Sequence, residues 1–161
     1  VMSNLSALIK PAETIAISAL IGFHPESLIE LIQKYLPTHE AFYPKDQLTD
    51  RNVRFFVSEM IREKIFHYYE QEIPYSTEVI VHDYQEGKTL DKIYAYIIVE
   101  RDSQKGIIVG KMGAGIKKIG TEARKDIEKF VGKKVFLDLR VKVEPDWRKN
   151  ELKLKHWGYM E

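Results

Sequence analysis

Strand-like patterns recur in the C-terminal part of the chain. Apolar and polar positions alternate over residues 78–84, which predicts a strand. The run Tyr-Ala-Tyr-Ile-Ile-Val at 94–99 predicts a second strand. Tyr94 and Tyr96 share one face of it, where they could be core or stacking residues, and we expect them to lie in the core. Over 135–143 every odd position is Val or Leu, whereas Asp, Arg and Lys lie between them, so this stretch is the clearest strand of the sequence.

Helix-like spacing precedes and separates these strands. After capping residues at 49–52, the apolar positions predict an amphipathic helix over 53–68. A polar turn is expected at 101–104, followed by a short helix over 105–109 and, beyond a glycine cluster, a longer amphipathic helix over 114–131. The predicted order is therefore helix, strand, strand, helix, glycine turn, helix, strand.

The N-terminal stretch has a different organisation. Residues 1–10 show helical spacing closed by a proline, and the short apolar run 14–20 predicts a buried strand. A helix is expected to open at Pro25 and to end before Pro37. We therefore expect this segment to contribute a strand followed by a helix.

A domain boundary is predicted at residues 38–49, where the hydrophobic residues no longer follow a helix or strand period. Residues 38–49 show no period and read as an irregular linker. The chain then divides into an N-terminal piece, 1–37, and a second domain, 50–161. The tail from residue 148 onward is expected to form a short helix packed back on that domain.

Composition and charge narrow the class of protein. Apolar residues make up 44% of the 161 residues and charged residues 30%, which excludes a disordered tail, and no apolar run reaches the roughly 18 residues of a membrane span. The absence of Cys excludes disulfide scaffolds and thiolate zinc sites. Residues 1–100 carry 9 Lys and Arg against 15 Asp and Glu, whereas residues 101–161 carry 16 against 9. The C-terminal part is therefore expected to face an anion.

The glycine cluster resembles three known motifs, of which two fail. A phosphate-binding P-loop would need Lys where Ile116 stands, and a dinucleotide fingerprint would need Gly where Lys118 stands. A G-x-x-G turn over 110–113, between two helices, remains. This turn is the signature of the KH module, which clamps about four nucleotides of a single strand.

The physics of such a turn suits a nucleic acid. Glycines let a sugar-phosphate backbone approach the main chain, and the following helix start adds N–H donors and partial positive charge. Lys111, Lys117 and Lys118 would anchor phosphates, while Ile108 and Ile119 would form a floor for unstacked bases. The alternative is a tight helix–helix turn whose glycines serve geometry only. The apolar residues before the turn, and the basic helix and strand after it, favour the binding interpretation.

Other chemistries find no support in the sequence. The five His form no helical metal pair, and the serines lack the G-x-S-x-G context of a hydrolase. The glutamates of the 53–68 helix lie among Arg and Lys, as on a solvated face. We therefore expect neither a catalytic residue nor a metal in this chain.

Several segments, in the same order, resemble the Era family of bacterial GTPases. They are 17–20, 43–50, 61–64, 73–76, 97–101, 108–113, 116–126, 141–143 and 157–159. The resemblance implies an α+β fold: a type II KH domain with a three-stranded sheet, helices on one face and the GXXG turn between two helices. It also implies that this domain follows a strand–helix remnant of a GTPase domain.

The family's function implies a ligand and a site. The ligand is the single-stranded 3′ end of 16S rRNA, bound during small ribosomal subunit assembly, and no DNA partner is expected. The implied RNA-binding residues are Ile108, Gly110, Lys111, Met112, Gly113, Ile116, Lys117, Ile119, Gly120 and Arg124. The alternative function is a protein–protein docking domain on the ribosome that does not contact RNA.

For the first segment, the resemblance implies a remnant of a guanine site at Ser18, Ala19 and Leu20. GTP and Mg²⁺ are implied for the full-length family, whose P-loop, switch and Asn-Lys-x-Asp motifs would precede residue 1. We therefore expect a fragment that needs no cofactor and neither binds nor hydrolyses GTP. The family further implies a cytoplasmic protein, with peripheral membrane association in full-length members.

Overall fold

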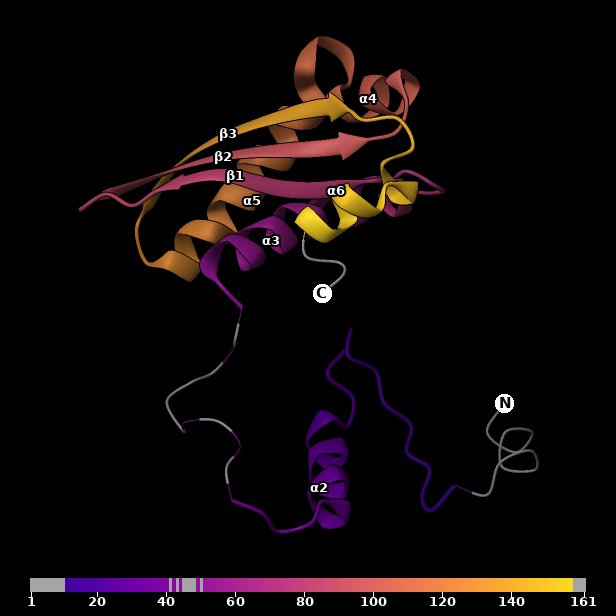
Figure 1. Cartoon of the computed structure of the whole chain (residues 1–161). Coiled ribbons are helices and arrows are strands. Elements are labelled where there is room, and N and C mark those ends of the chain that lie inside the picture. The colour runs from indigo at the N-terminus through magenta and orange to yellow at the C-terminus, as the bar shows by residue number, and fades with distance from the viewer. Residues whose placement is uncertain (1–10, 41, 43, 45–48, 50, 158–161) are drawn as a thin grey trace. The chain divides into compact units, whose positions relative to one another are not determined.

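The computed structural model describes residues 11–40, 42, 44, 49 and 51–157, and the chain forms two compact units, Val1–Leu48 and Thr49–Glu161 (Figure 1). The division falls at the end of the predicted linker. The helix expected over 1–10 lies outside the described residues.

The described part of the first unit contains the helix predicted there but not the strand. Helix α2 spans Pro25–Tyr35, with proline in its first turn as expected. The strand predicted over 14–20 is wrong: in the described part of this unit, Ser18 pairs only with Phe23, through N–H to O distances of 3.1 and 2.9 Å. An apolar run becomes a buried strand only beside a pairing neighbour, and without one Leu20 is 95% exposed.

The second unit is built on a three-stranded sheet. Its strands are β1 (Glu78–Gln85), β2 (Leu90–Val99) and β3 (Lys134–Val143), in that spatial order. β1 and β2 are antiparallel, with a bulge between Val81 and Asp83, whereas β2 and β3 are parallel and in register along their whole lengths. A parallel pair needs a crossover connection, and two helices with the glycine turn between them supply it.

The helices of this unit are α3 (Val53–Tyr68), α4 (Asp102–Val109) and α5 (Ala114–Val131). Their apolar positions pack on one face of the sheet (Figure 1). Side chains that are fully buried there include Val57, Ile61, Ile65, Ile93, Ile97, Val99, Ile108, Ile119, Ala123 and Ile127. This common core fixes α4, α5 and β3 relative to one another.

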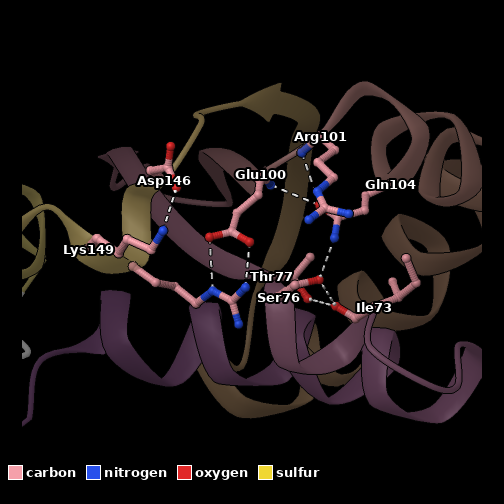
Figure 2. Close-up of polar contacts among 9 residues, drawn as sticks. Ile73, Ser76, Thr77, Glu100, Arg101, Gln104, Asp146 and Lys149 are labelled. Carbon is pink, nitrogen blue, oxygen red and sulfur yellow. Dashed lines mark hydrogen bonds and ion pairs between the residues drawn. The ribbon is translucent and has the colours of Figure 1, made fainter.

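Helix α4 begins three residues earlier than predicted, because Gln104 organises its start. The Gln104 side-chain oxygen accepts the main-chain N–H groups of Glu100 and Arg101, each at 3.0 Å, and its amide donates to the Ser76 hydroxyl at 3.0 Å (Figure 2). Gln104 is itself buried. A polar stretch that looked like a turn is therefore the capped first turn of a helix.

The remaining short helices are η1 (Pro74–Ser76), η2 (Lys111–Gly113), η3 (Trp147–Lys149) and α6 (Glu151–His156). The tail packs back on the domain as predicted: Trp147 is buried, its ring lies 5.6 Å from that of Trp157, and Arg148 pairs with Glu100.

The expectation that Tyr94 and Tyr96 lie in the core is wrong. On β2 the alternate residues Ile93, Ala95 and Ile97 are buried toward the helices, so the two tyrosines lie on the opposite, open face and are half-buried. A run of six apolar and aromatic residues hides this alternation in the sequence.

Candidate nucleic-acid interface

The G-x-x-G turn forms a sharp reversal between α4 and α5. Gly110 and Gly113 have φ values of 68° and 78°, a region that favours glycine, and the Gly113 N–H donates to the Gly110 carbonyl at 3.2 Å. Between them Lys111 and Met112 project outward, and Met112 is 98% exposed although it is apolar. Met112 also has a positive φ of 52°, so the backbone holds a strained conformation that presents this side chain to solvent.

Gly115 brings the two helices together beyond the turn. A Cβ on this residue would lie 2.4 Å from the Ile108 carbonyl oxygen and 2.7 Å from the Tyr69 hydroxyl. That hydroxyl donates to the same Ile108 carbonyl at 3.0 Å. The close approach fixes the direction of α5, whose first residue, Ala114, follows Gly113 without any side-chain cap. The Ala114 N–H donates to the Lys111 carbonyl, whereas no side chain caps the N–H groups that follow it in the first turn of α5, so these can meet an anion.

A groove of about 550 Å³ runs between α5 and β3. Its α5 wall consists of Ile116, Lys117, Gly120, Thr121 and Arg124, and its other wall of Leu90, Val135, Phe136, Leu137 and Leu139. An apolar floor with a basic rim suits bases and phosphates, respectively.

Gly120 keeps this groove wide. It lies inside α5, where glycine is about 0.5–1 kcal/mol less favourable than alanine. A Cβ would meet the Leu139 side chain only at 3.9 Å, an ordinary contact, so packing does not require a glycine. A ligand backbone that approaches α5 at this point would require a glycine, because a side chain would fill the space it needs.

Ion pairs leave the groove side of α5 positive. The carboxylates of this helix are paired with Lys as follows: Glu122 with Lys125, Asp126 with Lys64, and Glu128 with Lys134. The Lys64 hydrogen bond lowers the pKa of Asp126, and the Val135 N–H lowers that of Glu128, so both remain ionised and engaged. By contrast, Lys111 and Lys117 are exposed and form no ion pair with another described residue.

Two predicted contact residues are misplaced. Ile108 and Ile119 are completely buried in the core and form no floor for bases, because the helical period turns them toward the sheet. Leu137 and Leu139 of β3 provide apolar surface in the groove instead. The signal for this wall was present in the alternation of 135–143, but only the parallel pairing of β3 places it opposite α5.

The other predicted residues of the site are brought together. Gly110, Lys111, Met112 and Gly113 form the turn. Ile116, Lys117, Gly120 and Arg124 continue from it along the groove wall, with Glu128 one turn beyond Arg124. Lys118 instead lies with its ammonium 3.8 Å from the centre of the Tyr68 ring, so it contributes to packing between α5 and α3.

Ser18, Ala19 and Leu20 belong to the first unit, in a turn where Ser18 already donates its N–H to Phe23. Among the described residues, no three His, Asp or Glu gather as a metal site would require. Nor does any described helix have the length and apolarity of a membrane span.

Comparisons with known proteins agree with this geometry. The KH domain family profile matches residues 72–148. A variant of Aquifex aeolicus Era bound to GDP and AlF₄⁻ superposes with a TM-score of 0.89 at 35% sequence identity, over 99% of this chain and 55% of that one. An Era complex with MgGDPNP and nucleotides 1506–1542 of 16S ribosomal RNA gives the same score and identity, over 99% and 54%.

The chain thus spans about half the length of the Era structures that it matches. Its sheet order, its G-x-x-G turn and its groove are those of a KH domain. The second unit therefore contains a type II KH domain, and the chain matches the KH-containing C-terminal part of the Era family.

Proposed function

We propose that the groove between α5 and β3 binds single-stranded RNA, and that its ligand is the 3′ end of 16S rRNA. The observation that carries the proposal is the open, uncapped start of α5 beside exposed Lys111 and Lys117, at the mouth of an apolar groove. Main-chain N–H groups and the two lysines would hold phosphates, while unstacked bases would lie against Ile116 and Leu139.

The choice of ligand is supported by similarity. The related Era structure contains nucleotides 1506–1542 of 16S ribosomal RNA. In an Era-type protein, this domain would deliver a GTPase to the assembling small subunit, and residues 1–37 would be the end of the GTPase domain. GTP and Mg²⁺ would then be bound by motifs outside residues 1–161, with Ser18, Ala19 and Leu20 contributing only main-chain contacts to the guanine. Cytoplasmic location and peripheral membrane association remain predictions from the resemblance.

The proposal is tested by binding this chain to a short RNA that copies the 3′ end of 16S rRNA, with a scrambled RNA as the control. We expect clear preference for the native sequence. If the turn engages about three phosphates, at about 0.7 counterions each, log K should fall against log salt with a slope near −2. Failure to bind either RNA would instead favour the docking function.

A further inference from the structure

The open face of the sheet carries a cluster of rings, His82, Tyr94, Tyr96 and Phe136, which we call the aromatic face. The four residues belong to all three strands. Helices α3 and α5 cover one face of the sheet (Figure 1), and the alternation along β2 turns Tyr94 and Tyr96 to the other face. The His82 and Tyr96 rings are stacked, with centroids 4.4 Å apart and planes at 17°. The Tyr94 ring lies 6.1 Å from Phe136, which is itself 49% exposed. The core does not account for this concentration of half-exposed rings.

The aromatic face is continuous with the proposed RNA groove. Phe136 belongs to both, because it lines the groove and also contacts Tyr94. Strand β3 is the edge of the sheet, and Leu90 at the start of β2 lines the same end of the groove. A single strand leaving the groove at Phe136 would therefore pass over one edge strand and reach the tyrosines directly.

This face carries three cations beside the rings. Lys92, Arg140 and Lys142 lie on the same side of β2 and β3 as the tyrosines, because they occupy alternate positions of the two strands. Arg140 pairs with Asp138 and Lys142 pairs with Glu144, each at 2.7 Å. The Lys142 ammonium also lies 5.9 Å from the Tyr96 ring centre. Lys92 is exposed and has no ion-pair partner among the described residues. Cations between rings are the arrangement of surfaces that bind single strands by stacking.

We propose that the aromatic face is a second RNA-binding surface, which stacks nucleotides flanking those held in the groove. The proposal rests on the function proposed above. The groove clamps about four nucleotides, and bases beyond them would stack on Tyr94 and on the His82–Tyr96 pair. Because every base has a π-face, this surface would add affinity without adding much sequence preference.

The test compares two RNAs and two matched variants. The short RNA is the best-binding tetranucleotide from a tiling of the 16S rRNA 3′ region, and the long RNA extends it by about eight nucleotides, within the range of a stacking surface. Tyr94→Thr with Tyr96→Thr removes both rings but keeps good strand-forming residues, while Tyr94→Phe with Tyr96→Phe keeps the rings. We expect the Thr pair to weaken binding of the long RNA about tenfold and to change the short RNA less than about twofold, and the Phe pair to match the wild type.

Equal affinity of the Thr pair and the wild type for the long RNA would overturn the proposal, as would an equal loss for both RNAs. Lys111→Asp with Met112→Asp separates the two proposals, because it should weaken both RNAs; if it weakens neither, the groove function fails instead. If the double Thr variant does not fold, a crosslinking experiment on the wild-type chain still tests the proposal. Photo-crosslinking of the long RNA carrying 5-iodouridine should label the peptide with Tyr94 and Tyr96, and labelling confined to 105–124 would contradict the proposal.

Discussion

Two glycine turns of this domain, one between β1 and β2 and one over residues 110–113, differ in how their polar groups are satisfied. At the turn between β1 and β2, the Asp91 carboxylate accepts the Gly87 N–H at 2.9 Å and the Tyr84 hydroxyl at 2.8 Å, and Lys133 lies 3.5 Å away. Asp91 is buried, and all three of these groups that bind its carboxylate belong to the same domain. At the 110–113 turn, no side chain caps the helix that follows.

The glycines of the two turns differ in the same way. A Cβ on Gly87 would lie 2.1 Å from the Leu90 carbonyl oxygen, so this glycine is required by the fold. In the open turn, a Cβ on Gly110 would lie 3.0 Å from the Gly115 nitrogen, but around Gly113 nothing lies within 4 Å of such a Cβ. The comparison teaches how a turn built for the fold differs from one proposed to serve a ligand. In the first, a buried side chain holds the polar groups of the turn; in the second, the helix start has no side-chain cap and the nearby Lys111 and Lys117 have no ion-pair partner among the described residues.

Removing the carboxylate from the closed turn should have the largest effect. Asp91→Ala leaves the Tyr84 hydroxyl, the Gly87 N–H and the Lys133 ammonium without their partner, and we expect a loss of about 3 kcal/mol in the free energy of unfolding. Urea denaturation measures this loss. The control is Glu63→Ala, whose side chain is exposed and pairs with Lys64; it should change stability by less than about 0.5 kcal/mol. A stable Asp91→Ala variant would show that the network is dispensable.

Reversing charge on the open turn should affect binding and spare the fold. Lys111→Asp with Met112→Asp places two carboxylates where phosphates are proposed to lie, and we expect RNA affinity to fall about tenfold to a hundredfold. Both side chains are exposed, so the thermal midpoint should move by only a few degrees. Fluorescence anisotropy with a labelled RNA measures the affinity. Wild-type affinity in the double variant would place the ligand elsewhere.

Placing a methyl group in the groove should raise the stability of the domain and lower its RNA affinity. Gly120→Ala removes a glycine from the interior of α5, so we expect about 0.5–1 kcal/mol of added stability. The new methyl group would occupy the space that a ligand backbone needs, and we expect RNA affinity to fall about threefold to tenfold. If the variant is more stable and binds RNA as tightly as the wild type, the strand does not lie against this part of α5.

Lowering the pH should affect the two turns differently, with a smaller change than the substitutions above produce: it should reduce stability through Asp91 but leave RNA binding at the 110–113 turn unchanged. Hydrogen bonds from the Gly87 N–H and Tyr84 lower the pKa of Asp91 below its usual value, despite burial. Its contribution to stability is therefore complete above about pH 4 and is lost as the pH falls through the folded-state value. Urea titrations at several pH values should show a shallower acid loss in Asp91→Asn than in the wild type. The main-chain N–H groups proposed to hold phosphates at the open turn do not titrate, so affinity for a tetranucleotide should stay constant between about pH 5 and pH 8.

The sequence predicted helix α5 with its observed bounds, because glycines flank an unbroken amphipathic pattern. Strand β2 began at Leu90 rather than Tyr94, because ladders with both neighbours hold the polar residues Asp91 and Lys92 in the strand. The 14–20 strand failed since local hydrophobicity does not reveal whether a pairing neighbour exists.

The site was predictable only in part, for a related reason. The turn over 110–113 and the polar wall of α5 follow from local motifs. Leu137 and Leu139 enter the groove through the parallel pairing of β3, a contact between segments far apart in the sequence. The same pairing decides that Tyr94 and Tyr96 face outward. The pairing of strands far apart in the sequence therefore determined which side chains enter the groove, and the local pattern of residues could not show this.

The most direct test of the central claim is an NMR titration of this chain with a tetranucleotide from the 16S rRNA 3′ region. We predict that the amide signals of Gly110, Gly113 and Gly120 shift, while that of Gly87 in the closed turn stays in place. Shifts at Gly87 without shifts at Gly110, Gly113 and Gly120, or no shifts at all, would contradict the account.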